Sequence, residues 1–422
     1  MKVKVQSEYI RRFAESEPSL EGYEKLGGYK GLKTAIQRSP GDVRQEVVDS
    51  GLRGRGGAGF PTGKKWESVP ADERHKETIL VCNADEGEPG TFKDRYLMEH
   101  IPFLVLEGLT IAAYALQAGR MYIYIRGEYP EVYEGLQRAA RAARERNYLG
   151  EHILGSDFSI DLEVRIGGGS YVVGDETALL NSLMGKRGYP WMKPPFPTEK
   201  GAWGVPTVVN NVETLACLPV ILSEGAERFA RIGAPESPGP KLFCVSGAVQ
   251  NPGIFEFPMG VSVGDVIEAA GGTKGSLKAV QIGGTAGPVY TDAALSYKLD
   301  YESMKKRGGV LGSGALVIMD SKTNMAGVLE IIMRFFSEES CGQCFPCRYG
   351  TRQLAYMARR IACGQGRSSY LPLMVETTEI MDAASFCPFG QSVSLPLRSL
   401  FEGFGDEIER FIREQEYVKE VV

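Results

Sequence analysis

The sequence predicts an α+β protein of several domains, in which an α/β sandwich is followed by a small mixed sheet and then by a helical bundle. With 422 residues the chain is too long for one ordinary hydrophobic core, and typical domain sizes predict roughly three or four domains. Strand and helix patterns alternate over residues 73–240, whereas the periodicity from residue 324 onward is helical only. The order of these patterns predicts the order of the domains.

Composition and charge exclude several classes of function. A formal net charge of −5 provides no basic field that would attract nucleic acid. The first residues contain no apolar run as long as a signal peptide. The most apolar stretch, residues 101–119, is interrupted by Glu107 and is shorter than the roughly 20 apolar residues of a membrane span. We therefore expect a cytoplasmic protein with no direct membrane insertion and a buried helix in this stretch.

The N-terminal segment, residues 1–72, precedes the predicted sandwich. It combines short helical patterns with a glycine-rich loop, and no alternation of apolar and polar residues predicts a strand. Residues 41–51 predict a helix that leads directly into this loop.

The predicted sandwich of residues 73–240 begins with a strand in "ETILVCNADEGEPG", which the apolar helix follows. A second strand in "MYIYIRGEYP" leads into a long helix that starts after Pro130. The segment "SIDLEVRIGGGSYVVGDETALLNSLMG" then runs from a strand through a glycine-rich turn into a helix. Such alternation is typical of an α/β sheet, which binds its ligands beyond the carboxyl ends of the strands.

The last two predicted domains follow a proline- and glycine-rich segment, "GAPESPGP", which predicts a linker. In residues 241–323, four short apolar runs, in "KLFCVSGAV", "GIFEFPM", "AVQIGG" and "GALVIMD", predict a small mixed sheet, and "VGDVIEAAGG" predicts its single helix. In residues 324–422 apolar residues recur at helical spacing, which predicts a bundle. After the first helix, we expect further helices near residues 350–362, 371–384 and 398–417.

Four of the eight cysteines are spaced like the ligands of a metal cluster. Cys341, Cys344 and Cys347 form a C-x2-C-x2-C run, and Cys387 follows in "SFCPFG". Three thiolates from one turn and one from a distant loop suit a cubane [4Fe–4S] cluster. Zinc is the alternative, although zinc sites usually draw on paired C-x2-C units. The remaining cysteines stand singly and are expected to be buried or incidental thiols: Cys82, Cys217, Cys244 and Cys363.

The glycine-rich loop "GLRGRGGAGFPTGKKW" is a candidate phosphate or flavin site. Gly54, Gly56 and Gly59 match G-x-G-x-x-G, but the dinucleotide fingerprint requires a strand immediately before it, and here a helix is expected. A Walker loop is disfavoured because no Gly-Lys-Ser/Thr ending is present. Backbone N–H groups without side chains can still cradle an anion or a ring edge. Four cations of the loop could supply charge: Arg53, Arg55, Lys64 and Lys65.

The segment "NADEGEPGTFKDR" places a group of acids after the first predicted strand. Because carboxylates repel phosphate, we expect them to contact the sugar or the ring of a nucleotide. A solvated acidic turn is the alternative, and a calcium site is disfavoured because the spacing differs from an EF-hand. The acids are Asp85, Glu86, Glu88 and Asp94.

Two later segments are candidate nucleotide contacts. Glu176 follows the second glycine-rich turn and could bind a ribose 2′-hydroxyl, and its charge would repel a 2′-phosphate, so NAD is favoured over NADP. The alternative is a helix N-cap formed with Asp175. In "MKPPFP", Lys193 could meet phosphate and Phe196 could stack on a base, unless the segment is an ordinary rigid loop.

Taken together, these motifs resemble the NADH-binding flavoprotein subunits of respiratory complex I, the F subunits of NADH-quinone oxidoreductase. The resemblance runs from Gly51 to Phe401 in the same order. It implies a Rossmann-like FMN/NADH domain, a ubiquitin-like (β-grasp) domain and a C-terminal four-helix bundle with an iron–sulfur cluster. The matching segments are "RGRGGAGFPTGKKW", "NADEGEPGTFKDR", "GGGSYVVGDETALLNSL", "PPFP", "PTVVNNVETLA" and "CGQCFPC" with the later Cys-Pro.

The resemblance also implies a role for individual residues. Glu88 and Tyr171 are the candidate catalytic residues, although hydride transfer to a flavin requires no protein acid or base. The cluster ligands would be Cys341, Cys344, Cys347 and Cys387. The FMN contacts would be Gly54, Gly56, Gly57, Lys65, Asn83, Asp85, Gly174, Asn210, Asn211 and Thr214. The NADH contacts would be Phe60, Glu88, Tyr171, Glu176, Lys193 and Phe196. Two departures from the family pattern are Asp175, where many relatives have glutamate, and Gly87, where serine is common.

The implied function is oxidation of NADH by hydride transfer to FMN, with electrons passing singly to the [4Fe–4S] cluster. The implied partners are the [2Fe–2S] E subunit and the multi-cluster G subunit of the same complex, which would hold the chain at the cytoplasmic face of the inner membrane. One alternative is the diaphorase subunit of an NAD-linked hydrogenase or formate dehydrogenase. An alternative of a different class is a zinc-stabilised interaction scaffold.

Overall fold

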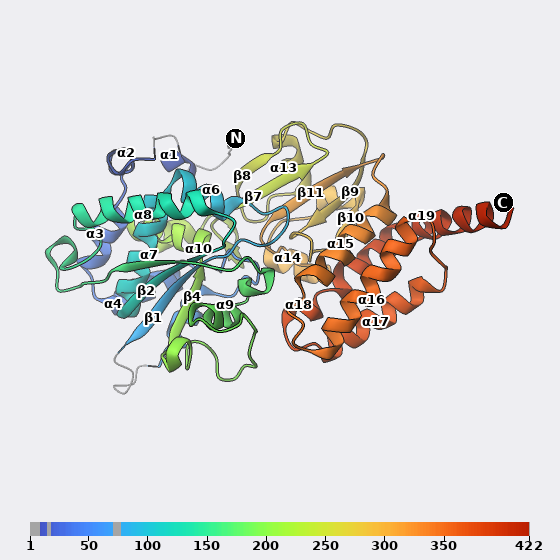
Figure 1. The fold of residues 1–422 in the computed structure, drawn as a ribbon. Helices are drawn as coiled ribbons and strands as arrows, with labels where there is room; N and C mark the ends of the chain where they lie inside the picture. Colours follow the sequence, from blue (N-terminus) through green and yellow to red (C-terminus); the bar gives the residue numbers. More distant parts are fainter. Residues whose placement is uncertain (1–8, 15–17, 71–76, 422) are drawn as a thin grey trace.

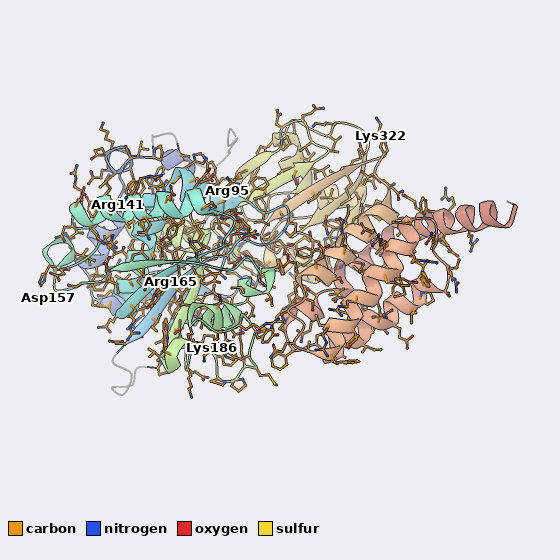
Figure 2. All side chains as sticks on the ribbon, viewed as in Figure 1. Arg95, Arg141, Asp157, Arg165, Lys186 and Lys322 are labelled. Carbon is orange, nitrogen blue, oxygen red and sulfur yellow. The ribbon has the colours of Figure 1, made fainter. Side chains whose placement is uncertain are left out.

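The computed structural model describes residues 9–14, 18–70 and 77–421. Three units follow one another along the chain (Figure 1): N-terminal helices with a parallel sheet, a second sheet, and a bundle of helices that leads to the C-terminus. The predicted α+β class and the predicted order of the units are therefore confirmed. Charged side chains such as Arg141 and Lys322 lie exposed on the outside of the molecule (Figure 2), as expected around an apolar interior.

The first sheet has four parallel strands in the order β3-β2-β1-β4. Along β1, Leu80 and Cys82 belong to one hydrophobic core, whereas Ile79 and Val81 belong to another. Both faces of the sheet are thus covered, which explains why the strand is a continuous apolar run rather than an alternating one. The strands are β1 (Thr78–Ala84), β2 (Ala118–Ile125), β3 (Leu162–Ile166) and β4 (Thr207–Asn211).

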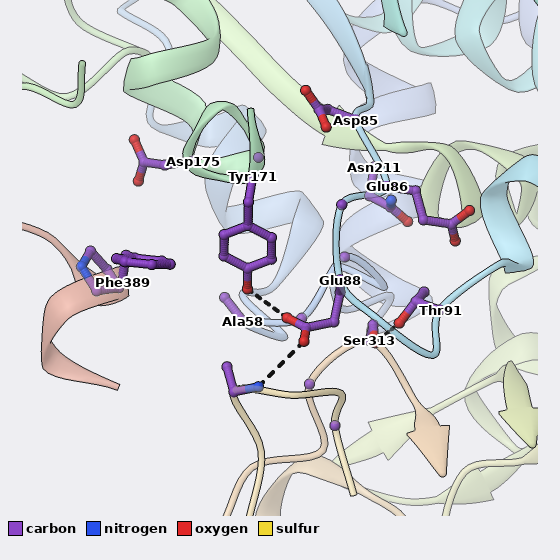
Figure 3. Close-up of a pocket in the computed structure, with 18 of the residues that line it drawn as sticks. Ala58, Asp85, Glu86, Glu88, Thr91, Tyr171, Asp175, Asn211, Ser313 and Phe389 are labelled. Atoms are coloured by element: carbon purple, nitrogen blue, oxygen red, sulfur yellow. Dashed lines mark hydrogen bonds between the residues drawn. The ribbon is translucent and has the colours of Figure 1, made fainter. Parts of the chain in front are cut away.

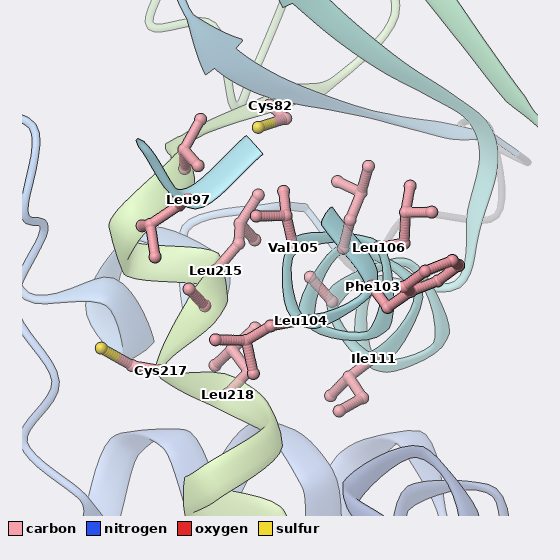
Figure 4. Close-up of a cluster of buried hydrophobic side chains, with 14 of the residues drawn as sticks. Cys82, Leu97, Phe103, Leu104, Val105, Leu106, Ile111, Leu215, Cys217 and Leu218 are labelled. Atoms are coloured by element: carbon pink, nitrogen blue, oxygen red, sulfur yellow. The ribbon is translucent and has the colours of Figure 1, made fainter. Parts of the chain in front are cut away.

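Helices fill the two cores of this sheet. In Figure 4, Cys82 of β1, Leu97 of α6, Leu104 of α7 and Leu215 of α10 contribute to the same core. Leu180 of α9 belongs to the other core. The helices around the sheet are α6 (Lys93–His100), α7 (Pro102–Leu116), α8 (Pro130–Glu145), α9 (Glu176–Leu183), α10 (Val212–Ala216), α11 (Leu218–Glu224) and α12 (Ala226–Ala230), with the 3-10 turns η1 (Ile153–Gly155), η2 (Tyr171–Gly174) and η3 (Ala202–Gly204).

Helix α7 is the buried helix that the sequence predicts, since every residue except Tyr114 is buried. Its carboxylate, Glu107, accepts hydrogen bonds from the hydroxyl of Tyr23 and from the backbone N–H groups of Tyr29 (2.7 Å) and Leu32 (3.0 Å). It therefore satisfies N–H groups at the start of α3 that no helical carbonyl can reach. Among the described residues no single helix is apolar and long enough to span a membrane, and only the bent pair α6 and α7 passes that test jointly.

The N-terminal helices lead to the glycine-rich loop. Helix α4 begins at a capping box formed by Ser39 and Asp42 and ends at Asp49, two residues before the loop. The expected helix is thus present where a dinucleotide fingerprint would need a strand, and that motif is excluded as predicted. The N-terminal helices are α1 (Arg11–Ala14), α2 (Leu20–Lys25), α3 (Lys30–Ile36), α4 (Pro40–Asp49) and α5 (Thr62–Glu67).

The second sheet is mixed, with five strands in the order β10-β9-β11-β7-β8, and only β7 and β11 are parallel. Val263, Val266 and Ile267 of α13 pack into its core. The sheet and its first helix agree with the sequence, which predicts only four of these strands. The elements are β7 (Pro240–Gly247), β8 (Gly253–Pro258), α13 (Val263–Ala269), β9 (Leu277–Ile282), β10 (Val289–Thr291), η4 (Asp292–Ser296), α14 (Tyr301–Lys306) and β11 (Ala315–Asp320).

Three details of this region differ from the prediction. Strand β10 is too short to display an alternating pattern, and the short, charged helix α14 lacks an apolar stripe, so neither was predicted. The expected linker instead contains a small antiparallel ribbon of β5 (Gly233–Ala234) and β6 (Ser237–Pro238). Proline, glycine and serine are typical both of linkers and of tight turns, so composition alone does not separate the two.

The C-terminal bundle also differs from the prediction in its helix boundaries. Helix α16 begins at Phe345, earlier than expected, because Pro346 occupies the first turn, where a missing N–H costs nothing. The four-residue helix α18 was not predicted. The bundle consists of α15 (Met325–Glu339), α16 (Phe345–Ala362), α17 (Tyr370–Ala384), α18 (Pro388–Gln391) and α19 (Ser394–Val421).

Candidate functional site

A cavity of about 420 Å³ lies at the carboxyl edge of the parallel sheet, and all three units line it (Figure 3). The strand partners Asn83 of β1 and Asn211 of β4 place two amides at this edge, where α/β sheets bind ligands. The lining segments are residues 56–58 of the glycine-rich loop, 83–94 after β1, 171–175 around η2, 283–286 and 310–313 of the second sheet, and 387–395 of the bundle.

The four acids after β1 all line this cavity, but they do different things. Glu86 accepts hydrogen bonds from the backbone N–H groups of Asp94 (2.8 Å) and Arg95 (2.9 Å), and so caps the start of α6. Asp94 bonds to the ammonium of Lys93 (2.7 Å) and to the amide of Asn211 (2.7 Å). These two carboxylates hold the turn together, which leaves Asp85 and Glu88 for a ligand.

Asp85 offers an acceptor with no partner. One of its carboxylate oxygens, Oδ2, is buried without a hydrogen bond among the described residues, and the side chain lines the cavity. A buried acceptor normally has a donor, so a ligand that donates a hydrogen bond here would fit the site. Burial raises the pKa of Asp85 to about 7, although Arg126 nearby opposes this.

This shift makes a prediction for the cofactor-free chain. Because the folded pKa lies above the unfolded value of about 3.9, the native state binds a proton that the unfolded state lacks between these two pH values. The free energy of unfolding should therefore fall as the pH rises toward 7 and level off above it. Relative to Asp85→Asn, wild type should lose about 2 kcal/mol between pH 5 and pH 7 in urea unfolding. Parallel pH profiles for the two proteins would contradict the assignment.

The candidate catalytic residues Glu88 and Tyr171 are in contact. The Tyr171 hydroxyl donates to Oε2 of Glu88 (2.5 Å), and the backbone N–H of Ala286 donates to Oε1 (3.3 Å), as the dashed lines in Figure 3 mark. A Cβ at Gly284 would lie 2.2 Å from Cγ of Glu88, so only glycine lets the second sheet approach this carboxylate. Burial and the neighbouring Glu88 raise the pKa of Tyr171 well above its ordinary value, which keeps its hydroxyl a donor.

The residues expected around FMN fall into two groups. The first group lines the cavity: Gly56, Gly57, Asn83, Asp85, Gly174 and Asn211. The second group does not line it, and its members instead hold the surrounding loops: Gly54, Lys65, Asn210 and Thr214. In that second group Thr214 accepts the backbone N–H of Arg55 (2.8 Å), and Asn210 accepts the indole N–H of Trp66 (3.0 Å).

Lys65 and the expected NADH contacts Glu176 and Lys193 form one ion-pair group. The two ammonium groups lie 3.1 Å and 2.6 Å from the Glu176 carboxylate. Although burial alone would raise it, these cations hold the pKa of Glu176 below its ordinary value. The N-cap alternative is correct for the neighbouring residue, because Asp175 accepts the backbone N–H groups at the start of α9.

The two phenylalanines expected near NADH, Phe60 and Phe196, are exposed to 53% and 49%. Neither lines the cavity, nor do Glu176 and Lys193, whereas Glu88 and Tyr171 do. Large exposed aromatic faces are available for stacking on a base.

A buried ion network beside the cavity was missed by the sequence analysis. The Glu213 carboxylate lies 3.0 Å from the ammonium groups of both Lys93 and Lys241, and all three side chains are at most 1% exposed. Lys241 belongs to β7, so the network ties the second sheet to the start of α10. Its members are far apart in the chain, and a lone lysine or glutamate in the sequence signals no partner.

The four clustered cysteines come from two loops. Cys341, Cys344 and Cys347 lie between α15 and the first turn of α16, and Cys387 is the N-cap of α18. Burial raises the pKa of Cys347 to about 12; the hydrogen bond with Ser340 opposes this, and the thiols of Cys344, Cys387 and Cys341 add to it. A Cβ on Gly390 would lie 3.1 Å from Cβ of Cys347, so glycine lets the two loops meet closely. The donor set, four unpaired thiols, fits an iron–sulfur cluster.

The cysteines do not form a site for a single metal ion. Over the described ranges, no three histidine, cysteine or acidic side chains are close enough together to hold one metal ion. Cys387 and Phe389 also line the cavity, so the cysteine loops border the same space as Glu88. Of the remaining thiols, Cys363 is exposed, and the others are buried as expected: Cys82, Cys217 and Cys244.

Comparison with known families assigns each unit. The "Nuo51 FMN-binding domain" matches residues 47–220, the "SLBB domain" matches residues 242–290, and the "NADH-ubiquinone oxidoreductase-F iron-sulfur binding region" matches residues 327–411. These segments contain the parallel sheet, most of the second sheet and most of the bundle, respectively.

Curated relatives match almost the whole chain. F subunit 2 of the NADH-quinone oxidoreductase of Rhizobium meliloti is 44% identical over 400 residues, which cover 94% of this chain and 95% of that protein. The corresponding F subunit of Escherichia coli is 42% identical, with 94% and 90% covered. The NADP-reducing hydrogenase subunit HndC of Solidesulfovibrio fructosivorans is also 42% identical, with 93% and 81% covered. A crystal structure of an NAD⁺-reducing [NiFe]-hydrogenase in the H₂-reduced state matches with a TM-score of 0.87 at 37% identity, covering 97% of this chain and 67% of that one.

Proposed function

Because the chain belongs to the family of NADH-quinone oxidoreductase F subunits, we propose that it is the electron-input subunit of such a complex. The resemblance found in the motifs is confirmed, and so are FMN and a [4Fe–4S] cluster as cofactors, with NADH as substrate. The zinc-stabilised scaffold is thereby set aside. The observation that carries the proposal is a cavity bordered both by the Glu88–Tyr171 pair and by Cys387.

FMN would occupy this cavity. The amides of Asn83 and Asn211, the unpartnered oxygen of Asp85 and the backbone of Gly56 and Gly57 are the groups available to its ring, sugar and phosphate. When bound, FMN supplies an acceptor for a hydride that can release its electrons one at a time. Thr214 and Asn210 hold the glycine-rich loop before binding, which limits the entropy lost on ordering its backbone N–H groups.

NADH would bind at the outer side of the flavin. Glu88 and Tyr171 would orient the nicotinamide, and the exposed rings of Phe60 and Phe196 would stack on the adenine. Glu176 would accept from a ribose hydroxyl, and its carboxylate disfavours a 2′-phosphate, which supports NAD rather than NADP. Lys193 would supply positive charge to the pyrophosphate. The protein orients the substrate and excludes water, and none of these residues needs to transfer a proton.

The cluster would be held by Cys341, Cys344, Cys347 and Cys387 as thiolates. Because Cys387 lines the cavity proposed for FMN, the cysteine loops border the space from which the cluster would receive its electrons.

The chain is a subunit of a multi-subunit NADH dehydrogenase or hydrogenase complex. We propose the [2Fe–2S] E subunit and the multi-cluster G subunit as its partners, and a peripheral position on the cytoplasmic face of the inner membrane through them. Helix α16, which carries Cys347, contains no acidic residue, and no carboxylate of the described residues pairs with its arginines. A partner with an acidic face would complement this surface. The arginines are Arg348, Arg352, Arg359 and Arg360.

The second candidate is the diaphorase subunit of an NAD-linked hydrogenase or formate dehydrogenase. The similarity to HndC and to the NAD⁺-reducing hydrogenase favours its hydrogenase form. Co-purification of the chain from its host, followed by assay of the complex with quinone and with hydrogen, separates the two candidates.

The function is tested by the Glu88→Gln variant. The purified wild type should show a flavin absorption band and a broad iron–sulfur shoulder, both bleached by NADH. Glu88→Gln should raise the KM for NADH about tenfold or more with ferricyanide as acceptor, because one charge-assisted contact is lost, while the FMN content stays unchanged. Glu134→Gln, on the exposed face of α8, serves as the control and should match wild type. A colourless wild type that leaves NADH unoxidised would refute the proposal.

A further inference from the structure

One carboxylate of the bundle contacts the backbone of the candidate nucleotide site. Glu339, the last residue of α15, accepts a hydrogen bond from the backbone N–H of Tyr171 (Oε2, 3.0 Å), although the two residues are 168 positions apart in the chain. The first cluster cysteine, Cys341, follows two residues later. The same short segment therefore carries a candidate cluster ligand and a contact to the candidate catalytic tyrosine.

This N–H group lacks a local partner. Tyr171 is the first residue of η2, and the first N–H groups of a helical turn have no intrahelical acceptor. The preceding Ser170 makes no side-chain cap. Glu339 thus does for η2 what an N-cap residue does for a helix, except that it comes from another unit of the protein.

The bundle also holds the side chain of Tyr171. Its ring packs edge-on against Phe335 of α15 at 5.0 Å between centroids, and at a tilt against Phe389 of α18 at 5.6 Å. On its other side the hydroxyl donates to Glu88. A Cβ at Gly87 would lie 3.2 Å from the Tyr171 ring, so the acidic turn is packed tightly on it. A displacement of the Tyr171 backbone would therefore move the hydroxyl that orients Glu88.

We propose that Glu339 is a positioning residue for NADH: it fixes Tyr171, and through it Glu88, from the unit that binds the cluster. The proposal rests on the proposed function, since it assumes that the Glu88–Tyr171 pair contacts NADH. It assigns to the segment before the cysteines a role in substrate binding that is separate from holding the cluster.

The test uses the full chain with both cofactors and ferricyanide as electron acceptor. Glu339→Ala removes the acceptor and should raise the KM for NADH about tenfold, with a smaller change in kcat and unchanged iron and FMN per chain. Glu339→Gln keeps an oxygen at the same reach, so it should restore the KM to within about threefold of wild type. Glu338→Ala changes the exposed neighbour and should have no effect.

A double-mutant cycle tests whether Glu339 acts through Tyr171. In the Tyr171→Phe background the hydroxyl contact to Glu88 is already absent, so Glu339→Ala should change the KM less than about threefold. An equal, roughly tenfold change in both backgrounds would overturn the proposed route.

Other outcomes also decide the matter. A wild-type KM in Glu339→Ala overturns the proposal while leaving NADH oxidation by wild type intact, so the proposed function survives. Loss of iron with an unchanged KM overturns it too, because Glu339 would then serve the cluster alone. If Glu339→Ala fails to fold, Glu339→Asp replaces it in the test. Amide hydrogen exchange then shows whether the folded Asp variant has lost the contact to the Tyr171 N–H. An unchanged KM for NADH in a variant that has lost this contact would overturn the proposal. If wild type does not oxidise NADH, both proposals fail.

Discussion

Replacing Cys347 by serine is expected to abolish electron delivery beyond the flavin. Cys347 is the most buried of the four clustered thiols, and serine does not supply a thiolate. Iron per chain should fall sharply and the low-temperature EPR signal of the reduced cluster should disappear. Electron transfer to the partner subunits should decrease at least about 100-fold. Loss of a residue that only supports a metal ligand already costs up to about 100-fold, and here a ligand itself is removed.

The same variant should retain its flavin chemistry. Cys347 does not line the cavity, so FMN content and NADH oxidation with ferricyanide should remain close to wild type. Cys363→Ser is the matched control, because Cys363 is exposed and stands apart from the cysteine run, and it should keep full iron content. A Cys347→Ser protein with full iron and an unchanged EPR signal would show that the ligand assignment is wrong.

Replacing Glu213 by glutamine is expected to destabilise the whole fold. The Glu213 carboxylate is fully buried between the ammonium groups of Lys93 and Lys241 and also accepts the backbone N–H of Leu242 (2.8 Å). Glutamine fills the same volume but leaves buried positive charge uncompensated. Breaking a buried pair in this way costs about 3–5 kcal/mol of unfolding free energy, which urea denaturation followed by circular dichroism would measure.

Two controls accompany this prediction. Glu227→Gln breaks the exposed pair with Arg231 and should leave the denaturation midpoint unchanged. The double variant Glu213→Gln with Lys241→Met removes one of the stranded charges, so its loss of stability should be smaller than the sum of the single losses. A midpoint for Glu213→Gln equal to that of wild type would mean that the network contributes nothing to stability.

The sequence predicts the long elements of the fold well and the short ones poorly. Long apolar runs and sustained helical periodicity identified β1, β2, α7 and α8 at nearly their observed positions, because the burial of an element on both faces or on one stripe leaves a pattern in the sequence. Elements of three to six residues, such as β10 and α14, leave no such pattern and were missed. The boundary of α16 was misplaced because proline, usually a breaker, is tolerated in the first turn.

Within the site, spacing identified the groups that lie close together in the chain. The cysteine run, the acidic turn and the glycine-rich loop are all contiguous motifs, and the roles of Glu88 and Tyr171 entered through the family resemblance. The hydrogen bonds that each of these groups makes could not be predicted from the sequence. Two of the four acids serve to cap α6 and to bind Asn211 and Lys93, which depends on where α6 begins in space.

The sequence by itself determined the class of the fold, the order of its units and the cysteines of the cluster, since each rests on residue type and short spacing, while FMN and NADH entered through the family resemblance. Only the tertiary structure decided which groups are already engaged. It joined Glu213 to Lys93 and Lys241, Ala286 to Glu88, and Glu339 to Tyr171. The reason is physical: a buried charge or N–H group must be satisfied by whichever partner the packing brings near, and partners far away in the chain leave no local signal in the sequence.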